Sequence, residues 1–129
     1  MAKNKYLKKQ LPPNASIKHR ELAKLLDEIF PFYTIVYEYS CADAAARKGV
    51  DPEDYGVQQQ AFDFYITELD MAIEMQGEQH YKENSFFGKG TIERDSRKRN
   101  FCQEVDIELI EVPYKTVISE LSIRKIIGV

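Results

Sequence analysis

The sequence predicts a single α/β domain with its elements in the order α-β-β-β-α-β-α and a mixed central sheet flanked by helices. The length of 129 residues is typical of one domain, and 43% hydrophobic with 30% charged residues is a globular composition with a buried core. Apolar residues recur at helical spacing in separate segments, and runs of β-branched and aromatic residues lie between them.

The N-terminal part predicts an arm, a helix and a strand. Residues 1–13 are basic and end in Pro12-Pro13, so we expect a flexible arm before a folded domain over 14–129. A helix capped by Asn14 or Ser16 follows and ends before Pro31, with Leu22, Leu25, Leu26 and Ile29 on its apolar side. Residues 33–39 form a strand. Residues 41–60 are expected to be an insert, made of a short helix and a loop.

The C-terminal part predicts three strands and two helices. Residues 62–77 read as two strands joined at Glu68 and Leu69. Residues 78–90 are polar and glycine-containing, which predicts a loop, and a helix is expected from Thr91 to about Val105. A strand over 107–112 and an amphipathic helix over 115–127 follow, the latter with Val117, Ile118, Leu121, Ile123 and Ile126 on one side.

Composition excludes several classes of protein. No apolar run is long enough to span a bilayer, and no signal peptide is recognisable, so we expect a cytoplasmic protein that does not contact membranes. Cys41 and Cys102 are too few for a disulfide framework and lack zinc-site spacing. We expect both to be buried.

The net charge of −3 gives no overall attraction to nucleic acid, but basic residues are clustered. Residues 1–20 hold six Lys and Arg and no acidic residue, and residues 89–99 hold a second cluster. Such runs are either solvated surface or phosphate-binding patches.

Two carboxylates lie within the apolar strands of residues 62–77. Asp63 stands between Phe62 and Phe64, and Glu74 follows three apolar residues. An unpaired charge is costly to bury, so each needs a partner. Facing carboxylates on neighbouring strands can bind a hard divalent cation, which can activate water and stabilise a phosphoryl group. The alternative is that they pair with Lys or Arg on a sheet edge.

The order of elements and the residues around this pair resemble the PD-(D/E)XK nuclease superfamily, whose core is α-β-β-β-α-β. The nearest likeness is to the branch of very short patch repair endonucleases with related phage and homing endonuclease domains. It covers about residues 16–115, and is carried by the segments Phe62-Asp63-Phe64-Tyr65-Ile66, Ala72-Ile73-Glu74-Met75-Gln76-Gly77-Glu78-Gln79-His80-Tyr81, Phe86-Phe87-Gly88, Glu93-Arg94-Asp95-Ser96-Arg97-Lys98, Phe101-Cys102 and Ile107-Glu108-Leu109-Ile110-Glu111-Val112-Pro113-Tyr114.

The resemblance implies a restriction endonuclease-like fold and a Mg²⁺ site, with Mn²⁺ as a substitute. Asp63 matches the superfamily's metal-binding aspartate and Glu74 its second acid, while the Met75 carbonyl is a further ligand. Glu21 on the first helix matches an acid that many of these nucleases bring to the metal. Its alternative is an exposed, solvated glutamate.

Gln76 stands where the superfamily usually has lysine, and glutamine carries no charge and cannot act as a base. Some members have Gln here, and others place the basic residue on the next helix. His80, Lys82 and Lys98 are the candidates to replace it. His80 has the pKa range of a general base. Lys98 either pairs with Asp95 on the same helix or faces the scissile phosphate.

The function implied is a Mg²⁺-dependent DNA endonuclease of phage or mobile-element origin, which would need a homodimer to cut both strands. Phosphate contacts are expected from Lys18, Arg20, Lys82, Arg94 and Arg97. His19 is expected to lie on the surface or contact phosphate, and Glu108 and Glu111 to be solvated. The alternatives are a degenerate nuclease fold that binds nucleic acid or a protein without cutting, and an unrelated α/β interaction domain.

Overall fold

The computed structural model describes residues 11, 13–76 and 86–129, with side chains described outside 86–92. The elements follow in the order α1 (Ile17–Ile29), β1 (Ile35–Ser40), α2 (Cys41–Lys48), the 3-10 turn η2 (Pro52–Tyr55), β2 (Ala61–Ile66), the 3-10 turn η3 (Thr67–Leu69), β3 (Met71–Met75), α3 (Phe86–Val105), β4 (Glu108–Val112) and α4 (Glu120–Ile127). The α/β class and the predicted order are confirmed, with α2 and η2 in the insert.

The four strands form one mixed sheet in the order β1-β2-β3-β4. The pairs β1–β2 and β2–β3 are antiparallel, and β3–β4 is parallel. A parallel pair needs a long crossover, and α3 lies within that connection. The predicted mixed sheet is therefore confirmed.

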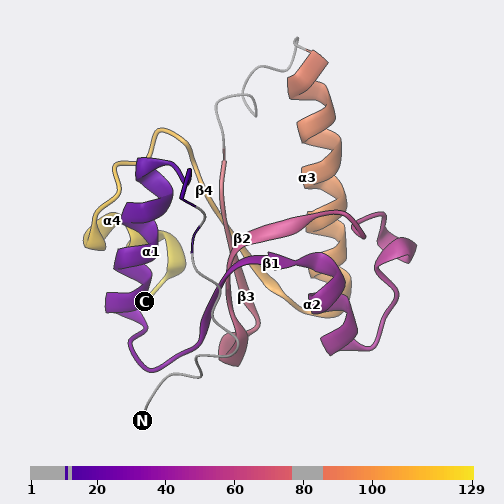
Figure 1. Ribbon diagram of the computed structural model, residues 1–129, viewed down its shortest axis with the longest axis horizontal. Coiled ribbons are helices and arrows are strands. Elements are labelled where there is room, and N and C mark those ends of the chain that lie inside the picture. The colour runs from indigo at the N-terminus through magenta and orange to yellow at the C-terminus, as the bar shows by residue number, and fades with distance from the viewer. Residues whose placement is uncertain (1–10, 12, 77–85) are drawn as a thin grey trace.

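Helices cover both faces of the sheet (Figure 1), with α1 and α4 on one side and α2 and α3 on the other. Each side has its own hydrophobic core. The first core includes Leu22, Leu26, Tyr37, Phe64, Ile73 and Ile123. The second includes Tyr39, Cys41, Phe62, Tyr65, Phe101 and Cys102. The expected burial of the two cysteines is confirmed, and the strand aromatics Tyr37, Tyr39, Phe62 and Phe64 are buried as well.

Helix α1 begins where the sequence predicts. Ser16 is the N-cap, and its hydroxyl accepts a hydrogen bond from the His19 backbone N–H. Leu22 and Leu26, a helical turn apart, are fully buried against the sheet. Leu11, within the predicted arm, packs partly buried against the same core. Residues 1–10 and 12 lie outside the described part of the chain.

Helix α3 begins at Phe86, five residues before the predicted start at Thr91. Gly88 and Gly90 belong to the segment that was predicted as a loop, yet both lie inside this helix. A glycine costs a helix only about 1 kcal/mol relative to alanine. Packing of the Phe101 end against the second core anchors the helix.

Helix α4 begins at Glu120 and not at Lys115. Ser119 and Ser122 form a capping box, each side chain bonded to the other's backbone N–H, which fixes the start. As a result Val117 and Leu121, predicted on the apolar side, are 78% and 80% exposed, whereas Ile123 is fully buried. Within the described residues, no helix has the length and apolar character needed to cross a bilayer.

Two substitutions in α4 test this later start. Ile123→Ala removes a fully buried side chain, so the free energy of unfolding should fall by about 2–5 kcal/mol. Leu121→Ala, two residues away on the exposed side, should change it by less than about 0.5 kcal/mol. Urea denaturation followed by circular dichroism measures both. Equal losses would mean that the helix presents the face predicted from the sequence.

Candidate functional site

Asp63 and Glu74 face each other on β2 and β3. The pairing of Phe64 with Ile73 continues by one residue to bring Asp63 opposite Glu74. The Asp63 backbone N–H donates to Glu74 Oε2 at 3.3 Å, and the Met75 N–H donates to Asp63 Oδ2 at 2.8 Å. The structure thus brings the two carboxylates together and places the Met75 backbone beside them.

The pair lies where the two cores meet. Phe62 belongs to the core under α2 and α3, while Phe64 belongs to the core under α1 and α4. On β1, Glu38 falls between the residues paired with Phe62 and Phe64, and so opposite Asp63. Glu38 has a left-handed backbone, with φ +52°, which costs roughly 1–2 kcal/mol in a non-glycine residue. This irregularity separates Tyr37 and Tyr39 into different cores.

Lys98 reaches the pair from α3. Its ammonium group donates to Glu74 Oε1 and, at 2.8 Å, to the Ala61 carbonyl oxygen. It also lies 5.9 Å from the centre of the Phe62 ring. The Lys98 and Glu74 side chains are only 14% and 15% exposed. Phe101, one helical turn further along α3, is fully buried and holds this face of the helix against the sheet.

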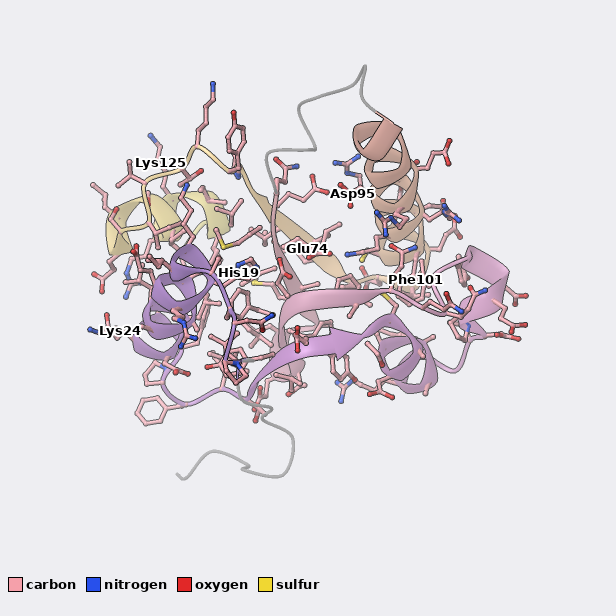
Figure 2. The ribbon with its side chains drawn as sticks, turned by 45° about the horizontal axis from the view of Figure 1, so that its top comes forward. His19, Lys24, Glu74, Asp95, Phe101 and Lys125 are labelled. Atoms are coloured by element: carbon pink, nitrogen blue, oxygen red, sulfur yellow. The ribbon has the colours of Figure 1, made fainter. Side chains whose placement is uncertain are left out.

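His19 reaches the pair from α1, on the other side of the sheet. Its Nε2 lies 3.4 Å from Asp63 Oδ2, and its Nδ1 lies 2.6 Å from Ser16 Oγ. The ring stacks on Phe64 with 6.2 Å between ring centres. Figure 2 shows Glu74 on the central sheet, between the helix that carries His19 and the helix that carries Asp95. Two basic side chains from different helices therefore converge on the carboxylates.

The hydrogen bond to Asp63 raises the pKa of His19 above its usual value, against the lowering effect of burial. For Asp63, burial acts upward, but the bonds from His19 and the Met75 N–H outweigh it and lower the carboxyl pKa. His19 and Asp63 thus favour each other's charged forms.

Burial, followed by the negative charge of Asp63, raises the pKa of Glu74 to about 8, against the opposing effect of Lys98. Burial would lower the pKa of Lys98, but the Glu74 carboxylate outweighs it and raises that pKa. Of the two facing acids, Asp63 therefore ionises first. The pair combines one firm anion with one acid that titrates near neutral pH.

A small cavity of about 260 Å³ opens beside Asp63. His19, Glu38 and Asp63 line it together with the segment that precedes α1. Its position makes Asp63 accessible from the α1 side of the sheet. Glu38 thus adds a third carboxylate to the surroundings of Asp63.

Gln76 lies two residues after Glu74, directly beyond the end of β3, and makes a different set of contacts. Its backbone N–H donates to the Val112 carbonyl at 2.9 Å, and its side-chain amide donates to Glu111 Oε2 at 3.4 Å. Arg99 holds the same Glu111 carboxylate with two bonds of 2.7 and 3.1 Å. The expectation that Glu111 is a solvated residue is therefore wrong, because it joins Gln76 to α3.

Glu21 does not meet the carboxylate pair, because its side chain is exposed on α1. Successive helical residues are turned by about 100°, so a side chain two positions after His19 points away from Asp63. His19, and not Glu21, is the α1 side chain that contacts Asp63. His80 and Lys82 lie outside the described residues.

The predicted phosphate-binding residues lie on two helices. Lys18 on α1 donates to the Tyr114 and Thr116 carbonyls, and Arg20 donates to the Pro13 and Ala15 carbonyls. These contacts tie α1 to the chain around it. Arg94 and Arg97 are exposed on α3, on the helical face that leads to Lys98.

Sequence reasoning missed His19 and Glu38 as members of the site. A signal for His19 was present, because it precedes Leu22 by three residues and Leu26 by seven, and so shares their buried face. The expectation of a surface position for His19 is corrected by its contact with Asp63. No sequence signal announces the left-handed backbone of Glu38.

The site offers few ligands for a divalent cation. Among the described residues, no group of three or more His, Cys, Asp or Glu side chains is arranged to hold a metal. Mg²⁺ is typically bound through one or two carboxylates and keeps several waters. Asp63, Glu74 and the backbone carbonyl of Met75 fit that pattern, and do not fit a zinc or calcium cage.

The His19–Asp63 contact should make stability depend on pH. A histidine whose pKa is raised on folding stabilises fully below its unfolded value, about 6.5, and loses this as pH rises through the folded pKa. His19→Ala should therefore lower the free energy of unfolding by roughly 0.5–1 kcal/mol more at about pH 5.5 than at about pH 8.5. Urea denaturation at both pH values measures it, and an equal loss at both would contradict the ion pair.

Comparisons with known proteins identify viral relatives. No family model matches the chain, and no solved structure matches it. Uncharacterized protein 094L of Frog virus 3 is 39% identical over 108 residues, covering 70% of this chain and 69% of that protein. Uncharacterized protein 033L of Invertebrate iridescent virus 3 is 34% identical over 65 residues, covering 46% of this chain and 34% of that protein. The chain therefore belongs to the same family as protein 094L of Frog virus 3.

Proposed function

We propose that this protein is a metal-dependent DNA endonuclease that hydrolyses phosphodiester bonds at the Asp63–Glu74 pair. One observation carries the proposal. Lys98 brings a positive charge from α3 to the Glu74 carboxylate, whereas Gln76, at the position of the usual lysine, carries no charge. The candidate site therefore has two acids and a lysine, although the lysine comes from a different element than in the usual motif.

Each residue has a role in this proposal. Asp63, Glu74 and the Met75 carbonyl would hold Mg²⁺ or Mn²⁺, which would supply positive charge at the phosphate and activate water. Lys98 orients the Glu74 carboxylate and stabilises negative charge that develops on the phosphate. Hydrolysis adds water across one P–O bond and leaves a hydroxyl and a phosphate monoester. His80 remains a candidate general base from outside the described residues.

A second candidate function is a module that binds DNA without cutting it. Gln76 stands at the position of the usual lysine and bonds to Glu111, which Arg99 also binds. This favours the binding module, because the contact is structural and leaves Gln76 no part in cleavage. Such a module would keep the basic α3 surface and need no metal. Metal-dependent cleavage separates the two functions directly.

Cleavage of supercoiled plasmid in Mg²⁺, in Mn²⁺ and in EDTA tests the enzyme. Asp63→Asn, Glu74→Gln and Lys98→Met should each lower the metal-dependent rate by about 100-fold or more, because each removes charge at the site. Arg124→Ala on α4 serves as the matched control and should cut normally. Equal trace activity in the wild type and all variants would reject the endonuclease and leave the binding module.

Moving the lysine back tests its role more sharply. Gln76 directly follows β3, two residues after Glu74, and its N–H still bonds to β4, so the two side chains are expected on the same face of the sheet. If Lys98 replaces the usual lysine, adding Gln76→Lys to the Lys98→Met variant should raise its cleavage rate by at least about 10-fold. Circular dichroism of the double variant confirms folding. A folded double variant as inactive as Lys98→Met would show that Lys98 acts in another way.

Whether one or both DNA strands are cut indicates whether the protein acts as a monomer or a dimer. One site of this kind nicks one strand, so we propose that cutting both strands requires a homodimer. Nicked circles would accumulate first from a monomer, whereas linear product would form directly from a dimer. An endonuclease encoded by a virus would act on DNA inside the host cell.

A further inference from the structure

A groove of about 500 Å³ runs between α3 and the loop that leads from η2 into β2. Three consecutive glutamines, Gln58–Gln60, form one wall. Arg94, Asp95 and Arg97 form the other wall, and Lys98 lies at the inner end. The groove is therefore lined by cationic, amide and carboxylate groups from two elements that are distant in sequence.

The groove leads into the candidate site. Lys98 lines it and at the same time donates to Glu74 Oε1 and to the carbonyl of Ala61, the first residue of β2. Arg94 and Arg97 are exposed along the groove, whereas Lys98 is partly buried next to the sheet. Whatever the groove binds is thus brought to the carboxylates.

Gly56 shapes the wall against Arg97. It has a left-handed backbone, with φ +70°, and a Cβ built on it would lie 3.0 Å from Arg97 Cδ. The absence of a side chain lets the Arg97 stem pack close to the loop. This contact joins the insert to α3 along the groove.

The glutamine wall has unused hydrogen-bonding capacity. Gln60 Nε2 donates to the Gly56 carbonyl at 3.2 Å, but Gln60 Oε1 is buried without a partner, alone among the buried side-chain atoms of the described residues. An unmet buried carbonyl is costly unless a ligand or water donates to it. Gln58 and Gln59 are exposed beside it.

These groups match the phosphate and the base of a nucleotide. Arginine and lysine bind phosphate, whereas glutamine pairs with adenine edges and aspartate accepts from the cytosine amino group. The Asp95 carboxylate on the same wall repels phosphate, so it suits the base and not the phosphate backbone. A volume of about 500 Å³ is in the range of pockets that enclose small ligands, so it suits a nucleotide more than a duplex.

We infer that this groove binds the nucleotide next to the phosphate that is cut and sets the sequence preference of the protein, with Arg94 and Arg97 on phosphates and Gln58–Gln60 with Asp95 on the base. The inference rests on the proposed function for its link to cutting. Its binding part can be measured without cleavage.

The phosphate contacts are tested by binding of a fluorescent DNA oligonucleotide to the full chain in EDTA, across a range of salt concentrations. Arg94→Ala/Arg97→Ala should weaken binding by about 10-fold or more and reduce the salt slope by about 1–2, because two phosphate contacts are lost. Arg124→Ala is the matched control and should leave both unchanged. Equal binding by the double variant and the control, or no binding by the wild type, would overturn the inference.

The base contacts are tested by selecting bound DNA from a pool with randomised positions, also in EDTA. Gln59→Ala should relax the preference at one or two positions by about 5–100-fold while leaving the salt slope unchanged. Gln103→Ala, an exposed glutamine on the same helix as Arg94 but outside the groove, is the control. Unchanged preference in Gln59→Ala and in the further variant Gln58→Ala would overturn base reading.

Failure of this inference and failure of the proposed function give different results. If the groove variants weaken binding but no metal-dependent cleavage occurs, the endonuclease proposal fails and the groove inference stands. If cleavage requires Glu74 but the groove variants change neither DNA binding nor sequence preference, the endonuclease proposal stands and the groove inference fails.

Discussion

The structure depends on the need to neutralise two facing carboxylates. Asp63 and Glu74 lie on adjacent strands, and Glu74 is mostly buried. Their carboxylates repel each other when both are ionised, and this repulsion contributes to the raised pKa of Glu74. Lys98 and His19 offset this repulsion from opposite sides of the sheet, each bound to one carboxylate. The helices that carry them, α3 and α1, are therefore held to the sheet by charge as well as by their apolar faces.

Other local features follow from this arrangement. Because the carboxylates lie between the two cores, the residues before and after Glu38 on β1, and before and after Asp63 on β2, pack into different cores. The left-handed backbone of Glu38 accommodates this change. Because Lys98 is close to Glu74, Gln76 is released to bind Glu111 and link β3 to β4 and α3. The same helix then exposes Arg94 and Arg97, and the insert supplies the opposite wall of a groove that ends at the site.

Much of this could be read from the sequence, since it depends on local patterns. The spacing of Leu22 and Leu26 gives α1 its buried face, and the hairpin joining β2 to β3 brings Asp63 opposite Glu74. The rest depends on contacts between distant segments. Which long side chain reaches Glu74 is decided by the packing of α3, so Lys98 could be named only as one of three candidates. Glu21 was preferred to His19 by family likeness, although helical geometry favours His19. The sequence predicts a solvated Glu111 because its partner, Arg99, comes from another element.

The central claim is that the Asp63–Glu74 pair is a divalent cation site. Calorimetric titration of the full chain with Mn²⁺ tests it without requiring any DNA substrate. The account predicts binding that Asp63→Asn and Glu74→Gln each weaken by about 10-fold or more, whereas His19→Ala, which frees Asp63 from a competing cation, binds at least as tightly as the wild type. Mn²⁺ binding that is equal in the wild type and in both carboxylate variants, or that is absent from the wild type, would contradict the account.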